Sequence, residues 1–207
     1  MDSQPEVMRR FPVPGWLLFA ANLALIGALT ALAPTERTLG ANIRLILLHG
    51  VWVWAGLLTF LAAALSGLAG LLRRQRAWQA WSLALGRTGL AFWLTYLPMS
   101  LLVMQINWGG LYFDEPRWRI PFAFAVAGTL LQVALGLFNR LDWAAGGNLV
   151  FGAALWAATL RMENILHPDA PILSPTAGGL QVFFVVLLGL ELLLAFQVAR
   201  WFFRRIR

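Results

Sequence analysis

Six long apolar runs constrain the fold of this chain more than any other feature of its sequence. A helix needs about 20 apolar residues to cross the ~30 Å hydrocarbon core of a membrane. The connections between the runs are too short to fold on their own. We therefore expect an all-α membrane protein, with six transmembrane helices in one bundle and a single domain over residues 1–207. The runs extend over about 16–33, 43–72, 87–106, 120–138, 143–160 and 180–202.

The composition agrees with a membrane location. The chain is 60% hydrophobic and only 12% charged, which differs strongly from a soluble domain. All sixteen basic residues are arginine, and there is no cysteine. The net charge of +7 therefore comes from groups that do not deprotonate. The missing thiols exclude disulfides, thiolate metal ligands and thiol catalysis within this chain.

The arginines are distributed unevenly between the two sides that the six runs define. Arginine concentrates on the cytoplasmic side of membrane proteins, so we expect both termini to be cytoplasmic. The external loops are then 34–42, 107–119 and 161–179. The basic balance thus reflects topology, and we expect no nucleic-acid partner. Ten arginines lie near inner ends (Arg9, Arg10, Arg73, Arg74, Arg76, Arg140, Arg200, Arg204, Arg205, Arg207) and five near outer ends (Arg37, Arg44, Arg117, Arg119, Arg161).

The first run resembles a signal peptide in its position and apolar character. It is longer than a usual signal core, however, and Pro34 directly follows the Ala31-Leu32-Ala33 site where cleavage would fall. We therefore expect it to be retained as the first span. Before the third run, Trp78 and Trp81 suit a separate interfacial segment, and Pro98 predicts a kink in the third span.

The external loop between the third and fourth runs has an unusual composition. It reads N-W-G-G-L-Y-F-D-E-P-R-W-R from Asn107 to Arg119, so aromatic residues stand beside acids and arginines. One interpretation is an interfacial belt, because Trp and Tyr settle at the membrane surface whatever the protein does. The other is a shelf for a flat apolar ligand that carries acidic groups, with aromatic faces against its plane and guanidinium groups on its carboxylates.

Both histidines of the chain, His49 and His167, fall on the same predicted side as this loop. A single histidine near an interface is usually a hydrogen-bonded structural residue. Two together can supply the axial ligands of an iron porphyrin, while Arg44, Arg117, Arg119 and Arg161 can pair with its propionates. A zinc site that joins the histidines to Asp114, Glu115 or Asp169 is a weaker alternative, because it would not require the aromatic residues.

The same residues resemble the haem-handling proteins of c-type cytochrome assembly, most closely the six-span CcmC type with its tryptophan-rich outer loop. In that family an arginine stands five residues before the first external histidine and a tryptophan five residues after it. This chain reads R-L-I-L-L-H-G-V-W-V-W, with Arg44, His49 and Trp54 at those positions. The family's Asn-x-Leu-His is matched by Asn164, Leu166 and His167, and its loop residues by Trp108, Gly109, Asp114 and Arg117.

The chain also departs from the family pattern at three places. Gly50 and Val51 replace the Val-Pro that follows the first histidine in the family. The loop is about one residue shorter and has Leu111, Tyr112 and Phe113 where the family has several tryptophans. Met162 and Glu163 occupy positions that are usually aromatic.

From this resemblance we expect a protein of the bacterial inner membrane that holds haem at the external face and presents it to an acceptor during c-type cytochrome biogenesis. The resemblance implies an external haem chaperone and transporter subunits as partners, beside membrane lipid. This role favours a haem-handling or transfer protein over a bond-breaking enzyme. The alternative is a non-catalytic membrane-anchor subunit of a larger respiratory or transport complex. The expected haem site comprises the iron ligands His49 and His167, together with Trp108, Tyr112, Trp118, Asp114, Arg117, Arg119, Arg44, Trp54 and Asn164; Met104 and Met162 are the next ligand candidates.

A single acidic residue, Glu191, lies near the middle of the sixth run. An ionised carboxylate within the membrane is costly and usually paired or functional. Gln132 in the fourth run lies at a similar depth. We therefore expect a protonated Glu191 that hydrogen-bonds Gln132, with a proton relay as the alternative.

Overall fold

The computed structural model describes residues 14–162 and 178–206, and these ranges contain six helices. All six are long and apolar enough to cross a membrane. The protein is therefore an all-α, multi-pass membrane protein with six spans, as the apolar runs predict. The helices are α1 (Gly15–Leu32), α2 (Ile43–Leu72), α3 (Arg76–Trp108), α4 (Pro116–Phe138), α5 (Leu141–Leu160) and α6 (Gly178–Phe203).

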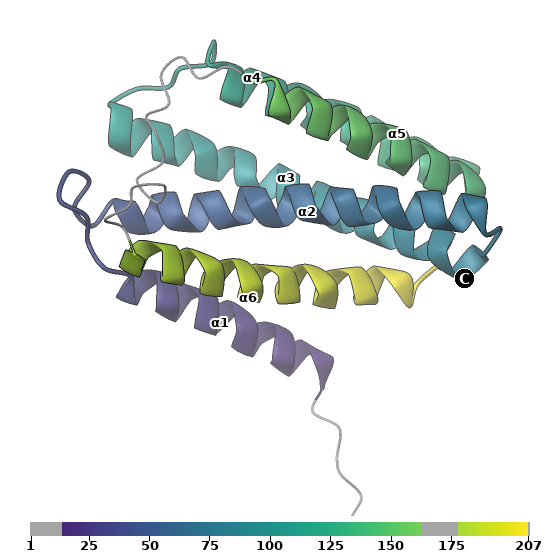
Figure 1. Ribbon diagram of the computed structural model, residues 1–207, viewed down its shortest axis with the longest axis horizontal. Helices are drawn as coiled ribbons and strands as arrows, with labels where there is room; N and C mark the ends of the chain where they lie inside the picture. The colour runs from purple at the N-terminus through teal and green to yellow at the C-terminus, as the bar shows by residue number, and fades with distance from the viewer. Residues whose placement is uncertain (1–13, 163–177, 207) are drawn as a thin grey trace, which may run out of the picture.

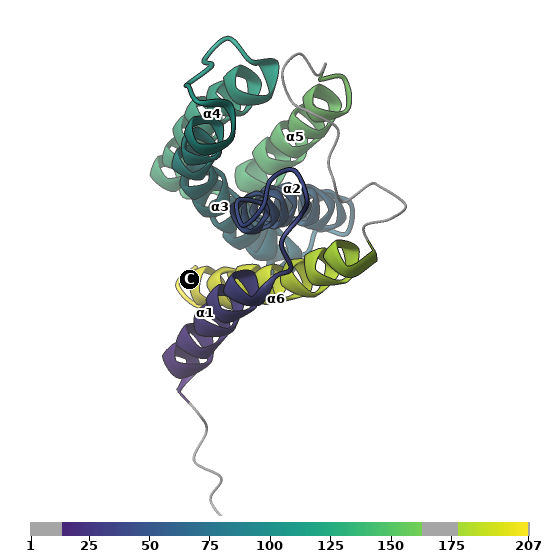
Figure 2. The same ribbon diagram turned by 90° about the vertical axis from the view of Figure 1, so that its left-hand side faces the viewer.

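The helices form three tiers, with α2 and α3 in the middle (Figure 2). On one side, α4 and α5 pack against the central pair, and on the other side α6 packs against the same two helices. Helix α1 lies outermost and contacts α6 and α2. The described parts of α4 and α6 therefore do not touch, because the central pair separates them.

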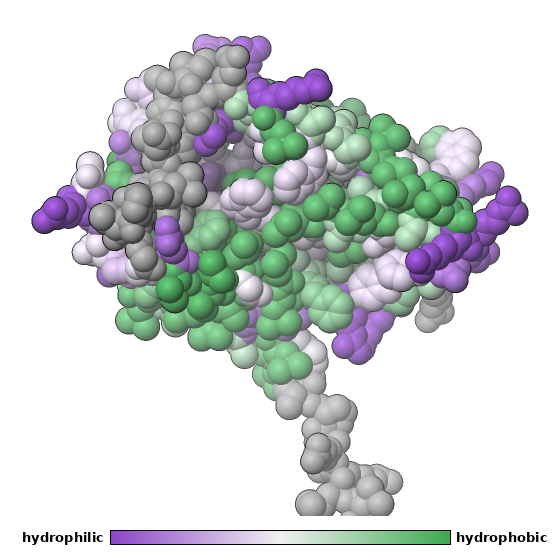
Figure 3. Space-filling view, viewed as in Figure 1, coloured by the Kyte–Doolittle hydropathy of each residue, from purple (hydrophilic) through white to green (hydrophobic). Residues whose placement is uncertain are grey.

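Successive helices run in opposite directions, so the bundle has two distinct ends (Figure 1). The loop end holds the connections 33–42 and 109–115. The arginine end holds the short turns 73–75 and 139–140 and the end of α6. Its described arginines are Arg73, Arg74, Arg76, Arg140, Arg200, Arg204 and Arg205. On the face that Figure 3 shows, hydrophobic surface covers the middle of the described part, between hydrophilic groups toward both ends. This distribution is typical of a bundle that lies across a membrane.

Helix α3 begins earlier than we expected. It starts at Arg76 and continues without interruption to Trp108, so the prediction of a separate interfacial segment at Trp78 and Trp81 was wrong. The first turns of α3 are held against α2: Gln79 Nε2 donates a hydrogen bond to the Gly70 carbonyl (3.2 Å), and Ser82 Oγ donates to the Ala63 carbonyl (2.8 Å). At ~1.5 Å per residue, α3 is ~50 Å long and exceeds the thickness of the hydrocarbon core.

A buried polar network joins four helices in the half of the bundle nearer the arginine end. Asn148 of α5 donates through Nδ2 to the Ser82 carbonyl of α3 (2.9 Å) and accepts from Gln132 Nε2 of α4 (2.7 Å). The Ser82 hydroxyl continues the network to α2. Gly86 gives Asn148 its space, because a Cβ there would lie 2.6 Å from Asn148 Oδ1. Small residues and interhelical hydrogen bonds of this kind hold membrane helices together.

Glu191 does not bind Gln132, so this prediction was wrong. Glu191 is fully buried, and the neighbours on its face of α6, Leu187 and Leu194, belong to a cluster that includes Val51 of α2. Neither carboxyl oxygen has a hydrogen-bond partner among the described residues. The two side chains have similar depths, but α4 and α6 lie on opposite sides of the central pair.

Candidate functional site

A cavity of about 610 Å³ lies at the loop end, between α2, α3 and the ends of α4 and α5. Its volume falls within the ~300–1,000 Å³ typical of small-molecule sites. Most of the wall is apolar, and the aromatic residues of the wall are Trp54, Trp93, Tyr96, Trp108 and Phe184. The wall residues that can bind a metal or a polar group are His49, Ser100, Met104, Asn107, Glu115, Arg117, Thr159 and Met162.

Helix α2 forms the first wall through one of its faces. Its cavity-lining residues include Ile46, His49, Val53 and Leu57, which recur every three or four residues, as expected for one face of a helix. The His49 ring is half-buried, and its centroid lies 5.5 Å from that of Tyr96. His49 is therefore fixed beside the cavity, one to two turns inside the start of α2.

Helix α3 forms the second wall. Tyr96, Ser100, Met104 and Trp108 line the cavity at steps of four residues. Trp93 closes this wall at its deep end, because its indole Nε1 donates a hydrogen bond to the Pro121 carbonyl of α4 (3.0 Å). The deep part of the cavity is therefore rigid and aromatic, while Trp108 lies at the mouth.

The loop that follows α3 turns sharply over the mouth. Gly109 ends the helix with a φ of +71°, a conformation that glycine adopts at low cost. Pro116 then occupies the first position of α4, where its missing N–H is not needed. Between them Glu115 is 2% exposed and faces the cavity, and Arg117 of α4 also contributes to the wall. The mouth thus carries one carboxyl group and one guanidinium group.

The other aromatic residues of the loop lie outside the cavity. Tyr112 and Phe113 are exposed. The Trp118 ring stacks on Phe122, with centroids 5.0 Å apart and planes at 12°, and Phe113 contacts it edge-on. This outer aromatic cluster of Phe113, Trp118 and Phe122 fits an interfacial belt. The residues of this region are therefore divided: some line the cavity and the others face outward.

The structure brings four of the predicted site residues to the cavity and leaves five elsewhere. His49, Trp54, Trp108 and Arg117 line it, whereas Tyr112, Asp114, Trp118 and Arg119 do not. Asp114 and Arg119 lie 4.0 Å apart and are largely exposed, so this ion pair contributes little. Arg44 is used elsewhere, since its Nε donates a hydrogen bond to the Ala33 carbonyl at the end of α1 (2.9 Å).

The two remaining predicted residues, Asn164 and His167, lie outside the described residues, as does Asp169 of the zinc hypothesis. Within ranges 14–162 and 178–206, no group of three or more His, Asp or Glu side chains can hold a metal ion. Both methionines that the sequence offers as further ligands, Met104 and Met162, line the cavity with His49. Their sulfur atoms and the imidazole are the soft and borderline donors that iron accepts.

Tyr96 and Ser100 are cavity residues that the sequence prediction missed. Their spacing could have identified them, because Tyr96 and Ser100 continue the four-residue repeat of Met104 and Trp108 along one face of α3.

Comparisons of the chain with family models, curated proteins and solved structures found no match. The resemblance to the CcmC type therefore rests on the quoted residues alone.

Proposed function

We propose that this protein binds haem in the loop-end cavity and presents it to an acceptor during c-type cytochrome biogenesis. One observation carries the proposal. His49 and Trp54 come from α2, whereas Trp108 and Arg117 flank the loop between α3 and α4, and all four line the same cavity. Each of them matches a position of the CcmC pattern. If the resemblance were accidental, there would be no reason for these four residues to line one cavity.

The chemistry of the cavity fits haem. A haem group needs an axial donor, flat apolar contacts and a positive charge near its propionates. His49 supplies an imidazole, and Trp54, Tyr96 and Trp108 supply aromatic faces. Arg117 at the mouth is suitably charged for one propionate. When bound, the haem iron would accept His49 as a ligand, and His167 remains the proposed second ligand, with Met104 and Met162 as alternatives.

The arginine distribution supports the proposed orientation, in which the loop end faces outward from the bacterial inner membrane. Seven described arginines lie at the arginine end, and arginine-rich ends stay in the cytoplasm. The cavity then opens on the side where an external haem chaperone can approach. Reporters fused after Arg74 and within the 109–115 loop test this orientation. A cytoplasmic signal from the loop would overturn it.

The alternative function, a non-catalytic membrane anchor, has support from the outer aromatic cluster, which serves an interfacial belt equally well. An anchor has no need of the cavity. The two functions therefore differ in one property, the binding of haem.

An absorption spectrum of the purified protein, titrated with haem, tests the proposal. We expect a Soret band that saturates at one haem per chain. His49→Ala should lose or shift this band while the protein inserts normally, and added imidazole should restore it by filling the vacant position. Leu48→Ala, at the adjacent residue outside the cavity wall, is the matched control and should keep the wild-type spectrum. If the wild-type protein binds no haem, the proposal is wrong and the membrane-anchor function is favoured instead.

A further inference from the structure

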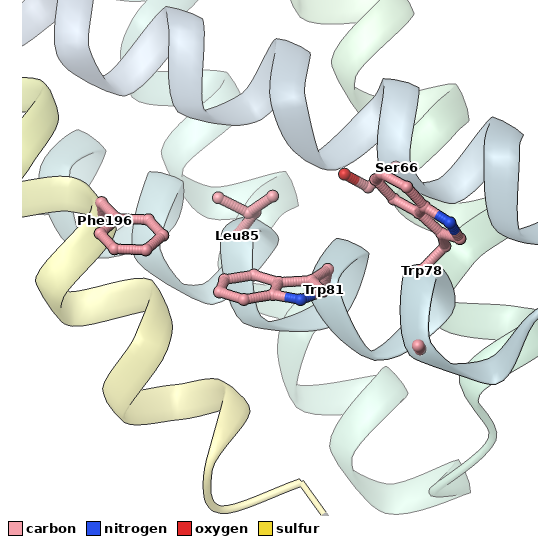
Figure 4. Close-up of a pocket in the computed structure, with 6 residues that line it drawn as sticks. Ser66, Trp78, Trp81, Leu85 and Phe196 are labelled. Carbon is pink, nitrogen blue, oxygen red and sulfur yellow. The ribbon is translucent and has the colours of Figure 1, made fainter.

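A second hollow lies near the arginine end, remote from the haem cavity. It is a groove of about 390 Å³ at the junction of α2, α3 and α6. Its lining is almost entirely apolar and aromatic, so it suits a hydrocarbon chain better than a polar ligand. The lining residues are Ser66 of α2, Ala77, Trp78, Trp81 and Leu85 of α3, and Phe196 of α6 (Figure 4).

Stacked aromatic rings give the groove a rigid wall. The Trp81 ring lies nearly parallel to Phe203, with centroids 4.4 Å apart, and to Phe196, with centroids 6.1 Å apart. Trp78 is 40% exposed on the other side (Figure 4). Exposed tryptophan at this level is typical of the zone where acyl chains meet headgroups. The groove is thus open to the lipid and does not close within the bundle.

Each helix that lines the groove continues into an arginine at the same end. Arg200 follows Phe196 by one turn of α6, Arg76 directly precedes Ala77, and Arg73 follows Ser66 by two turns of α2. Residues four or seven apart lie on the same face of a helix, so Arg200 and Arg73 extend the faces of Phe196 and Ser66, while Arg76 is placed by its position as the first residue of α3. The positive charges therefore lie at the arginine end, just beyond the groove.

These arginines have no acidic partner within the described chain. The only described acidic residue at the arginine end, Asp142, pairs with Arg140 at 2.7 Å. Arg73, Arg76 and Arg200 form no ion pair with any described side chain. A guanidinium group binds phosphate well, and basic pockets between helices on the cytoplasmic side attract anionic headgroups.

We propose that the groove binds an anionic phospholipid. One acyl chain lies against Trp81 and Phe196, and the phosphate lies between Arg76 and Arg200. The combination of an apolar slot with an uncompensated positive rim favours a lipid over a soluble anion, which would have no use for the slot. The site is independent of haem binding.

The proposal is tested by titrating the purified full-length protein in neutral detergent with two lipids that share the same acyl chains, phosphatidylglycerol and phosphatidylcholine. Native mass spectrometry counts the bound lipid. We expect phosphatidylglycerol to bind more tightly by about 25-fold, at about fivefold for each of two arginines. Equal binding of the two lipids would overturn the proposal. Equally effective competition by glycerol phosphate, which has no acyl chains, would do the same.

Variants separate a defined site from general surface charge. Arg76→Gln with Arg200→Gln should remove the preference for phosphatidylglycerol. Arg140→Gln is the control for Arg200→Gln, because it removes the same charge from the same end but lies in the tier beyond α2 and α3. If Arg140→Gln and Arg200→Gln lower phosphatidylglycerol binding equally, the effect reflects general surface charge and the proposal fails. Ala77→Phe should fill the slot and weaken both lipids, and it keeps the test independent of the arginines.

Discussion

The clearest test of the cavity compares two tryptophans of the same loop region. Trp108 lines the cavity, whereas Trp118 stacks outside it on Phe122. If the cavity binds haem, Trp108→Ala should weaken binding and Trp118→Ala should not. If the loop is only an interfacial belt, the two substitutions should have similar, small effects.

The expected magnitude follows from the area of the Trp108 ring. A tryptophan buries ~150–250 Å² when fully covered. Because the ring lies at the mouth, roughly half of this area, ~100 Å², is available to a ligand. At ~25 cal/mol per Å² the loss is ~2.5 kcal/mol, which corresponds to a roughly 70-fold increase in Kd. Trp118→Ala should change Kd by less than about threefold, since remote sites are nearly independent.

The assay is a haem titration followed at the Soret band, with wild type and the two variants at equal detergent concentration. Protein yield and helical content serve as controls for folding. Equal losses of affinity in the two variants would refute the assignment of Trp108 to the wall. An unchanged Kd for Trp108→Ala would show that haem, if bound at all, lies elsewhere.

Three further predictions concern stability and pH. Asn148→Ala removes three interhelical hydrogen bonds, so the free energy of unfolding in detergent should fall by about 1–3 kcal/mol. Thr129→Ala, which loses a bond only within its own helix, should change this free energy by less than about 0.5 kcal/mol, and an equal effect of the two substitutions would contradict the network. Glu191→Leu should raise the unfolding midpoint, because it removes a buried carboxyl group that lacks a hydrogen-bond partner among the described residues; a lower midpoint would show that the carboxyl group is paired. Backbone N–H groups, that of Leu39 foremost, lower the pKa of Glu36 below 4.5, so its contribution to the 33–42 loop is present above that value and is lost as the pH falls through the lowered pKa. The protection factor for amide exchange at Leu39, corrected for the pH dependence of intrinsic exchange, should therefore fall at acidic pH in wild type but be independent of this titration in Glu36→Gln.

The division of the loop residues shows how a local sequence pattern differs from a site. In the sequence, Trp108 and Trp118 are equivalent, because both are tryptophans beside charged residues. Gly109 and Pro116 end α3 and begin α4, and the resulting turn leaves Trp108 and Glu115 on the cavity side. The outer aromatic cluster remains available to the membrane interface. One short loop can therefore serve both a binding site and an interfacial belt.

The six spans follow from the sequence alone, because the cost of exposing polar groups to lipid leaves an apolar run of this length few alternatives to a helix. The placement of 33–42 and 109–115 at one end also follows, since short connections force neighbouring helices to alternate in direction. His49, Trp108 and Arg117 could be placed near this end for the same reason, because depth from one end of the bundle is a property of position in the chain. Trp54 was predicted only from the family resemblance.

Only the tertiary structure decides which helices face each other. Depth along the membrane suggested a bond between Glu191 and Gln132, but α2 and α3 separate their helices. The same packing brings Met104 and Tyr96 to the wall opposite His49 and directs Arg44 to the end of α1. Hydropathy records how deep a residue lies in the membrane. The neighbours of a helix depend on side-chain packing, such as the fit of Asn148 against Gly86, which no single run of sequence contains.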